Sequence, residues 1–407
     1  MSTVLRLAPD IKQLSLILGA ALLIGGCAGL PYTPELQDSS AFFSRTIIKE
    51  EGGIRVHAAV PDAAEAAEYF QLPLYDKDVQ PVWLSVENNT DRPVRLMHWS
   101  IDPDYFSPLE VAWMFRNGYS KEGKAEIERT LYNAAIDRRV DPGETLSGFI
   151  FTHYKPGTKG FNVDVISGKP DSYSFTFFVP MPGFIADYMT VDFQNLYSDD
   201  EITSVTLEEL RAAIEQLPCC STDANGSGSG TPFNVALVGT GQAVRRALLR
   251  AEWQETEDGS AINALSAKQF YKGRKPDGNF IKARSDGTER KELRLWLTPF
   301  RMDEKRVWLA QAVNVIADSI GKTKEPFVAG NIDDTLLYIM QDFWYTQSLS
   351  KVGFTQFMEG VSDEDRATTF DQMLYYTRGS RGVLVLSEDP IGLDEVKNLG
   401  WGPIPGG

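Results

Sequence analysis

The chain has few of the residues that most often perform catalysis. Its 407 residues include three histidines and three cysteines, and it carries no G-x-S-x-G, H-E-x-x-H or Cys-His pattern of a hydrolase or metalloprotease. His57, His98 and His153 lie far from Cys219 and Cys220 in sequence, so we expect no zinc site built from both residue types. His98 stands in a strand pattern, which predicts a packed side chain. The sequence therefore predicts no metal and no cofactor, and it does not favour an enzyme.

The cysteines also limit which cross-links can form. Cys219 and Cys220 are adjacent, so they cannot join distant segments of one chain. A vicinal disulfide and a pair of small buried thiols are the two states expected in an oxidising compartment. A redox dithiol usually needs wider spacing, such as C-x-x-C, so we do not favour a redox function.

The chain also lacks a long apolar run near its start. The uncharged stretch Gln13 to Gly26 is shorter than the roughly 20 residues of a membrane-spanning helix. It follows Arg6 and Lys12 and ends in two glycines before Cys27, which is the order of charge, apolar run and small residues in an export signal. An ordinary secretory signal followed by an unrelated cysteine is the alternative interpretation.

The end of this stretch resembles the lipobox of bacterial lipoproteins. In that family the cysteine sulfur takes a diacylglycerol and the freed amine takes a further acyl chain, such as palmitate. The resemblance implies a signal peptide over residues 1–26 and lipidation at Cys27. Because Ala28 follows the cysteine, the resemblance further implies attachment to the outer membrane, facing the periplasm.

The net charge excludes some partners. The formal charge is −16 at neutral pH, and a chain this acidic is repelled by nucleic acid and by anionic lipid surfaces. We expect no nucleic acid partner, and we attribute the charge to solubility. The membrane is expected as a partner through the lipid anchor instead.

Patterns along the chain predict an α+β protein with two domains. Residues 27–40 resemble a lipidated tether, because prolines interrupt them and no periodic apolar pattern is present. Residues 41–197 carry short strands with turn signals, which predicts an immunoglobulin-like β-sandwich with a helical insertion. Residues 198–230 predict a helix and a flexible Gly/Ser linker. Residues 231–407 predict an α+β domain with a C-terminal extension.

Several elements of the first domain can be placed by their residues. Strands are expected over 82–86 and 94–99, on either side of a turn rich in Asn, Asp and Pro. Helices are expected over 108–116 and 121–136. Trp83, Trp99 and Trp113 lie in apolar runs, and we expect them in the core.

The second half alternates helices and strands. Thr206 and Glu209 form a capping box that begins a helix. Helices are also expected over 242–252 and 333–345, and strands over 293–297 and 307–310 are expected to pair. The acidic pair Asp333-Asp334 is interpreted as an N-cap and a first-turn charge.

The segment from about Leu217 to Tyr345 resembles the LssY-like C-terminal domain family of bacteria. An ordered set of short motifs carries the resemblance: Leu217-Pro218-Cys219, Pro232 to Gly239, Trp253, Gly273-Arg274 with Asp277, Arg290, Arg294 and Trp296, Val307-Trp308, and Ile332-Asp333. The family has no assigned activity, and relatives joined to membrane phosphatase-like modules imply a place near lipid phosphates. This chain has Lys291-Glu292 in place of a His pair and Thr335-Leu336 in place of Glu-Arg. Parts of any catalytic or metal-binding cluster are therefore missing.

Arginines of this segment are the candidate anion-binding residues. Arg274, Arg290 and Arg294, with Asp277, could converge on a phosphate or carboxylate, because a guanidinium fork suits such anions. Arg290 and Arg294 are four residues apart on one expected strand and share a face. The alternative, which we favour, is a solvated sheet face on which the arginines pair with Asp277 and Glu292.

A glycine-containing turn is a second candidate for an anion site. Gly239-Thr240-Gly241 joins an expected strand to an expected helix, and helix N-termini attract anions. The segment lacks the third glycine of a dinucleotide site and the Lys-Ser/Thr of a P-loop. An ordinary strand-to-helix turn is the favoured interpretation.

Two functional hypotheses follow. The first is a non-enzymatic binding or structural module of the cell envelope, held by its lipid anchor and in contact with an envelope protein or lipid. The alternative is a hydrolase or ligand-binding domain that acts on a phosphorylated envelope lipid through Arg274, Arg290 and Arg294. Convergence of these arginines with Asp277 and Asp333 in a cleft would favour the alternative, and their dispersal would oppose it.

Overall fold

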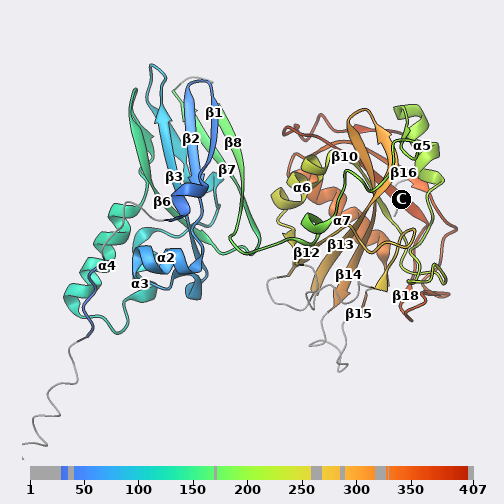
Figure 1. Ribbon diagram of the computed structural model, residues 1–407, viewed down its shortest axis with the longest axis horizontal. Coiled ribbons are helices and arrows are strands. Elements are labelled where there is room, and N and C mark those ends of the chain that lie inside the picture. Colours follow the sequence, from blue (N-terminus) through green and yellow to red (C-terminus); the bar gives the residue numbers. More distant parts are fainter. Residues whose placement is uncertain are drawn as a thin grey trace, which may run out of the picture. The chain divides into compact units, whose positions relative to one another are not determined.

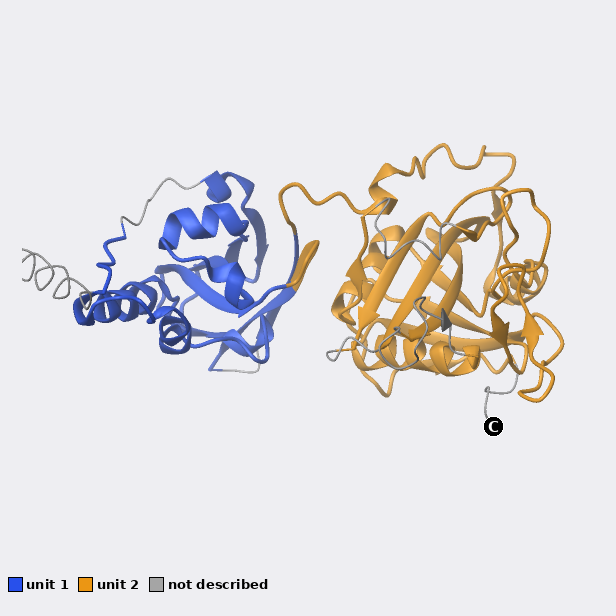
Figure 2. Cartoon of the chain, turned by 90° about the horizontal axis from the view of Figure 1, so that it is seen from below, with its two compact units in different colours: residues 1–154, 161–179 blue, residues 155–160, 180–407 orange. Residues whose placement is uncertain are grey.

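The computed structural model describes residues 29–34, 41–168, 172–257, 268–284, 289–316, 327–328 and 330–401. The predicted signal peptide and Cys27 lie outside these ranges. The chain divides into two compact units, residues 1–154 with 161–179 and residues 155–160 with 180–407 (Figure 2). The first unit ends at Val179, whereas the sequence led us to expect the boundary between Tyr197 and Thr231. Residues 180–197 therefore belong to the second unit.

The first unit contains two sheets in the part of the chain that is described (Figure 1). One has the strand order β1-β2-β3-β6 with antiparallel pairs, and the other has the order β5-β4-β7-β8. β3 is buried on both of its faces, as expected for a strand that is covered on both sides. The strands are β1 Ile47–Glu51, β2 Ile54–Ala59, β3 Val79–Asn88, β4 Val94–Met97, β5 Arg139–Val140, β6 Thr145–His153, β7 Thr158–Ser167 and β8 Ser172–Pro180.

Helices pack against β6 in this unit. Their apolar residues join Phe149 and Phe151 of β6 in one buried cluster. Ser107 and Ser120 cap two of the helices by accepting hydrogen bonds from backbone N–H groups one turn later. The predicted helices over 108–116 and 121–136 are confirmed. The helical elements are η1 Ala41–Arg45, α2 Ala63–Phe70, η2 Leu74–Lys77, η3 His98–Ser100, α3 Pro108–Phe115 and α4 Lys121–Ala134.

β3 and β4 do not pair with each other, although they were expected to flank one turn. β3 pairs with β2 and β6, and β4 pairs with β5 and β7. The connection between them carries the chain from one sheet to the other. Asn88 holds it, because its Nδ2 donates to the carbonyl of Arg92 at 2.7 Å and to that of Val140 at 3.0 Å.

Two of the tryptophans expected in the core are at the surface. Trp99 and Trp113 are exposed, whereas Trp83 packs edge to face against Phe43 with ring centroids 4.9 Å apart. Trp113 lies on the outer side of α3, and Val111 and the other apolar residues on its inner side fill the core. The apolar run around Trp113 therefore does not place every one of its side chains inside.

Residues 29–34 lie along the connection between α3 and α4. The Leu30 N–H donates to the Gly118 carbonyl at 2.8 Å, and the Ser120 N–H donates to the Leu30 carbonyl at 2.9 Å. Tyr32 is buried, and its hydroxyl donates to the Phe70 carbonyl at 2.6 Å. Residues 29–34, which belong to the segment expected to be a tether, are therefore packed on the first unit.

The second unit is built around a mixed sheet. Among the described residues its strand order is β11-β12-β13-β14-β10-β19-β16-β20, with β9 beside β13 and β15 beside β14. The predicted pairing of 293–297 with 307–310 is confirmed, because Leu297 lies opposite Trp308 in the register of β13 and β14. The strands are β9 Thr203–Ser204, β10 Val235–Gly239, β11 Gln254–Glu255, β12 Gly278–Ala283, β13 Glu289–Met302, β14 Lys305–Ile316, β15 Phe327–Val328, β16 Leu349–Gln356, β17 Ala367–Thr368, β18 Leu374–Tyr375, β19 Ser380–Leu386 and β20 Lys397–Asn398.

Helices cover both faces of this sheet. Leu293, Leu295 and Leu297 pack on one face with residues of α6 and α7, while Ala236 and Val238 pack on the other face with residues of α5. This division follows from the alternation of side chains along each strand. The capping box predicted at Thr206 is confirmed at the start of α5. The helical elements are η4 Asp187–Thr190, α5 Leu207–Glu215, α6 Gly241–Arg250 and α7 Ile332–Tyr345.

The Gly/Ser segment expected as a flexible linker is hydrogen-bonded within the second unit. The Gly230 N–H donates to the Ser221 carbonyl at 2.8 Å, and the Phe370 N–H donates to the Ser229 carbonyl at 2.8 Å. The Asp223 carboxylate accepts two backbone N–H bonds inside the same turn, each at 2.9 Å. These bonds show that the small residues form a fixed turn against residue 370.

Candidate functional site

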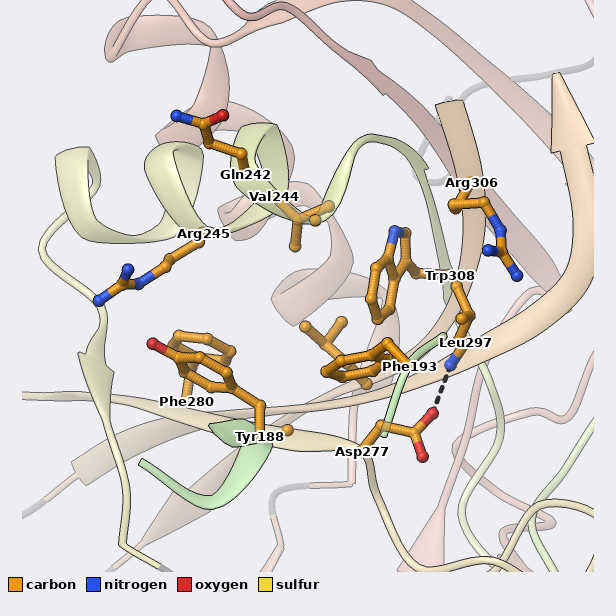
Figure 3. A pocket seen from close by; sticks show the side chains of 13 residues that line it. Tyr188, Phe193, Gln242, Val244, Arg245, Asp277, Phe280, Leu297, Arg306 and Trp308 are labelled. Atoms are coloured by element: carbon orange, nitrogen blue, oxygen red, sulfur yellow. Dashed lines mark hydrogen bonds between the residues drawn. The ribbon is translucent and has the colours of Figure 1, made fainter. Parts of the chain in front are cut away.

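A pocket of about 510 Å³ lies in the second unit, where the start of α6 meets β12, β13, β14 and residues 188–193 (Figure 3). This volume falls within the range of about 300–1,000 Å³ that is typical of small-molecule sites. Aromatic and aliphatic side chains form most of the lining, with a few polar groups among them. The lining residues are Tyr188, Phe193, Gly241, Gln242, Val244, Arg245, Asp277, Gly278, Phe280, Leu295, Leu297, Arg306 and Trp308.

Paired aromatic rings form the body of the pocket. Tyr188 stacks on Phe280 with ring centroids 6.0 Å apart and an interplanar angle of 11°. Phe193 meets Trp308 edge to face at 5.5 Å, and the Trp308 Nε1 donates to the Gly239 carbonyl at 3.2 Å. Because Phe280 and Trp308 belong to the buried core cluster, the pocket floor is apolar and packed against the core.

Asp187 holds the segment that carries Tyr188. Its carboxylate accepts hydrogen bonds from the Asn279 N–H at 3.0 Å, from the Asn279 Nδ2 at 2.7 Å and from the Thr256 hydroxyl at 3.1 Å. Burial raises the pKa of Asp187, and these donors oppose the shift. The carboxylate thereby fixes η4 to β12 and sets Tyr188 over Phe280.

Arg245 lies at one side of the pocket, where its charge is balanced. Its Nε donates to the Glu255 carboxylate at 3.0 Å, and its guanidinium also donates to the Thr158 hydroxyl at 2.7 Å. The Tyr188 hydroxyl donates to the same carboxylate. Burial, followed by the bond to Glu255, raises the pKa of Tyr188. Tyr188 therefore remains a neutral hydroxyl and offers the pocket its ring.

Arg306 lies at the other side of the pocket, beside Trp308 (Figure 3). Its Nε is buried and has no hydrogen-bond partner among the described residues, and no described carboxylate forms an ion pair with it. Burial and then the neighbouring Arg301 lower the pKa of Arg306, because both disfavour its charged form. An anion at this end of the pocket would relieve both effects.

Arg274 and Asp277 are joined to each other at the edge of this pocket. The Arg274 guanidinium donates to the Asp277 carboxylate at 2.6 Å, to the Tyr197 hydroxyl at 3.0 Å and to the Leu297 carbonyl at 2.8 Å. Asp277 also accepts the Leu297 N–H at 2.6 Å. Burial raises the pKa of Asp277, and Arg274 opposes the shift. Asp277 lines the pocket with its charge already paired.

Arg290 and Arg294 lie elsewhere on β13, on either side of Glu292. Arg290 contacts one Glu292 oxygen at 2.7 Å, and Arg294 contacts the other at 2.8 Å. The expected pairing with Glu292 is present, but the face is buried and not solvated, because the side chains of Arg294 and Glu292 are 1% and 5% exposed. Between described residues, no ion pair or hydrogen bond joins these arginines to Arg274 or Asp277. The predicted candidate residues thus form two separate groups, in which Arg274 is paired with Asp277 and the two β13 arginines share Glu292.

The Arg294 group continues into a buried polar network that the sequence analysis missed. Arg294 donates to Gln311 at 3.3 Å, and the Gln311 Nε2 donates to the Ser221 hydroxyl at 2.8 Å. Ser221 in turn donates to Gln269. Single amide and hydroxyl side chains give no periodic signal, so the network becomes visible only when the strands are paired.

Cys219 and Cys220 are joined by a disulfide bond directly before this network. Cys220 is buried, and the Phe233 N–H donates to the Cys219 carbonyl at 2.7 Å. The bond links neighbouring residues, so it stiffens the turn after α5 and connects no distant segments.

The acidic start of α7 has a structural role. Asn331 is the N-cap, two residues before the first member of the expected acidic pair, and its side chain accepts the Asp333 N–H at 3.1 Å. The Asp333 carboxylate accepts the Thr377 hydroxyl at 2.6 Å and the Arg378 N–H at 2.7 Å. Asp333 anchors a neighbouring loop, and no described hydrogen bond joins it to the three candidate arginines.

The turn Gly239-Thr240-Gly241 begins α6 beside the pocket. The Thr240 hydroxyl caps the helix by accepting the Ala243 N–H at 3.0 Å and donates to Glu388. This arrangement matches the ordinary strand-to-helix turn favoured from the sequence. The structure adds that Gly241 and Gln242 lie in the pocket lining.

A second hollow lies in the first unit and is lined by Arg92, Arg95 and Arg139 with Ile166. Arg92 and Arg95 are exposed or partly exposed on the surface, and Arg139 forms an ion pair with Asp141 at 2.6 Å. Exposed guanidinium groups are well hydrated and bind single anions weakly. The aromatic pocket of the second unit is therefore the better candidate site.

The described residues contain no group of three or more His, Cys, Asp or Glu side chains placed to hold a metal ion. None of the helices in the described ranges is both long and apolar enough to cross a membrane.

Comparison with known families assigns most of the residues that line the pocket to one family domain. No curated protein matches the chain. Residues 211–380 match the family described as LssY C-terminus, and this range includes every lining residue of the pocket except Tyr188 and Phe193. The resemblance seen in the sequence is confirmed over a wider range than 217–345. The second unit of this chain therefore contains an LssY C-terminal domain.

Proposed function

We propose that this chain is a lipoprotein of the bacterial cell envelope and acts as a non-enzymatic binding module. The anchor is Cys27, which follows a charged start and an apolar run in the sequence. Each buried methylene of an acyl chain contributes about 0.8 kcal/mol, so several chains hold a protein firmly. The proposed location is the outer membrane, with both units facing the periplasm.

The first unit is proposed to be an immunoglobulin-like β-sandwich. The sheets β1-β2-β3-β6 and β5-β4-β7-β8, together with the burial of β3 on both faces, support this assignment. In this account the unit is a platform near the membrane, and binding takes place in the second unit.

The pocket of the LssY domain is the observation that carries the binding proposal. Its aromatic body fits an apolar chain or ring, and Arg306 at its edge has no carboxylate partner among the described residues. A ligand that places an apolar part against Phe193 and Trp308 and an anionic group at Arg306 would satisfy both features. The proposed ligand class is therefore an amphipathic anion, such as an acyl or isoprenoid chain that carries a phosphate or carboxylate.

The arginine arrangement does not favour the hydrolase alternative. Arg274 is paired with Asp277, and Arg290 and Arg294 are paired with Glu292. An anion clamp would need these charges to be available in one cleft. The binding proposal instead uses Arg306, which the sequence analysis did not select.

Titration with decyl phosphate tests the pocket. We expect the full-length chain in mild detergent to bind it more tightly than decanol, with a change in tryptophan fluorescence from Trp308. Arg306→Gln should weaken binding about tenfold or more, because a hydrogen bond to a charged group contributes about 1.5–3 kcal/mol. Phe193→Ala should also weaken it.

Arg211→Gln is the matched control, because Arg211 is an exposed arginine on α5 of the same unit and lies outside the pocket lining. It should leave the affinity for decyl phosphate unchanged. Equal binding of decyl phosphate by the wild type and by Arg306→Gln would refute the proposed anion subsite.

A separate experiment tests the anchor. With Cys27→Ser, the protein should be found in the soluble fraction after alkaline washing of the membranes. Mass spectrometry of the wild-type N-terminal peptide should show acylation. A wild-type peptide without acyl chains would reject the lipoprotein assignment whatever the pocket binds.

A further inference from the structure

α3 presents large apolar side chains to solvent. Leu109 and Trp113 are 55% and 58% exposed, and residues four apart on a helix lie on the same side. The Arg116 guanidinium lies 4.1 Å from the centroid of the Trp113 ring. Isolated exposed apolar residues are normal on proteins, but apolar neighbours on one helix form a patch, and such patches are typical of interaction sites.

The N-terminal end of the described chain lies beside the same helix. Leu30 is 66% exposed, and it pairs with Tyr119 in the connection that follows α3. Its backbone bonds to Gly118 and Ser120 fix it there. α3 has eight residues and is therefore about 12 Å long, so Leu109 lies within about that distance of the end of α3 that leads to Tyr119.

Chain length then limits where this patch can be. Cys27 precedes Leu30 by three positions, and three residues span at most about 11 Å. With acyl chains on Cys27, Leu30 is held within about that distance of the membrane surface. A spacer of the length expected for residues 28–40 would have removed this restriction, but residues 29–34 are packed on the first unit.

We infer that Leu30, Leu109 and Trp113, named here the α3 face, rest on the surface of the bilayer that holds the anchor. The inference depends on the proposed lipidation of Cys27. Tryptophan suits this position, because its ring is amphipathic and is enriched where apolar and wet regions meet. Leu109 adds an apolar side chain that can enter the headgroup region.

The charges around the α3 face are mixed. Arg116 and Lys121 are cations, while Glu110 and Glu122 are carboxylates in the same two helices. These charges offset one another, so contact depends on the apolar side chains and not on anionic lipid. The contact should therefore persist at high salt.

This contact assigns a specific place to the first unit. The unit lies on the membrane at α3 and the connection to α4, and the anchor and the α3 face act as two attachments. Contact with the bilayer gives a physical reason for the exposure of Trp113.

Site-specific fluorescence tests the inference. The full-length chain would carry Leu109→Cys labelled with a small fluorophore, in vesicles of phosphatidylethanolamine and phosphatidylglycerol. Ile48→Cys is the matched control, because Ile48 is a 56% exposed apolar residue of β1 in the same unit. Quenching by brominated lipid and by aqueous iodide would be measured for both labels, at low and high salt. Acylation of Cys27 would be measured by mass spectrometry on the same preparation.

We expect the label at position 109 to be quenched by brominated lipid and protected from iodide, and the label at position 48 to show the reverse, at both salt concentrations. Acylated protein whose label at position 109 is as open to iodide as the label at position 48 would overturn the α3 contact and leave the anchor standing. Protein that is not acylated and does not stay with the vesicles would reject the anchor, and the α3 inference with it.

Discussion

Removal of the Glu292 charge should destabilise the second unit strongly. Glu292 lies between Arg290 and Arg294, and its side chain is 5% exposed. Arg294 is nearly fully buried, and its Nε already has no hydrogen-bond partner among the described residues. Glu292→Gln leaves the Arg294 charge buried without a counter-ion, and breaking a buried pair in this way costs about 3–5 kcal/mol.

Related variants separate this effect from a general loss of a charge. Arg290→Gln should cost about 1 kcal/mol or less, because the Arg290 side chain is partly exposed and surface pairs contribute little. Arg211→Gln is the matched control, since it breaks an exposed pair with Glu215 on α5, and it should cost about 0.5 kcal/mol or less. Glu292→Leu combined with Arg294→Met should be more stable than Glu292→Gln, because no buried charge remains unpaired.

Hydrogen exchange of the β13 and β14 amides at increasing urea concentrations would measure these free energies. This measurement reports the second unit separately from the first. If the free energy of unfolding of Glu292→Gln lies within about 1 kcal/mol of the wild-type value while the control behaves as expected, Arg294 does not depend on a buried ion pair with Glu292. The assignment of the β13 arginines to structure would then be wrong.

Three further predictions concern other parts of the chain. Burial and then Arg138 lower the pKa of His98 to about 4, whereas the unfolded state takes up this proton near pH 6.5. The free energy of unfolding of the first unit should therefore fall by up to about 3 kcal/mol between pH 6.5 and 4. Urea unfolding of His98→Gln should show a smaller fall over the same pH range. Gly379→Ala should lower the free energy of unfolding by more than about 2 kcal/mol, as measured by thermal unfolding, because φ is +78° and a Cβ would lie 2.2 Å from the Met358 carbonyl. Gly118→Ala, where φ is +90° and no atom lies near the added Cβ, should lower it by less. Arg381→Lys should destabilise the second unit by about 2 kcal/mol or more, because Arg381 donates to the carbonyls of Phe233, Ile214 and Pro218. Equal unfolding midpoints for the wild type and Arg381→Lys would contradict that role.

Local signals in the sequence predicted local structure well. The capping box at Thr206 and the pairing of 293–297 with 307–310 are present as expected. Both depend on residues that are close in sequence, so the pattern contains the information. The order of LssY motifs also identified the domain, because short motifs on strands β10, β13 and β14 and at the start of α7 follow one another in the expected sequence.

Features set by long-range pairing could not be predicted in this way. A turn rich in Asn, Asp and Pro is compatible with a hairpin and with a crossing between sheets, and Asn88 selects the crossing by bonding to Val140. The pocket depends on Tyr188 in the short helical turn η4 and on Phe193 just after it, and Asp187 fixes this turn to Asn279. No periodicity marks such a segment.

The candidate arginines show what strand alternation can and cannot reveal. The spacing of Arg290 and Arg294 correctly placed them with Glu292 on one face. It could not show that this face is buried, because burial depends on residues around 221 and 269 that pack over it. Arg306 was missed because its special feature is the lack of a partner in space, and sequence does not display that.

The most direct test of the central claim is mass spectrometry of the lipids that remain with the full-length chain after purification from membranes. The account predicts an anionic amphipathic lipid in the wild type and in the exposed control Arg211→Gln, and its loss in Arg306→Gln and Phe193→Ala. An equal amount of the same lipid in all four proteins, or no retained lipid in the wild type, would contradict the claim that the LssY pocket binds an amphipathic anion.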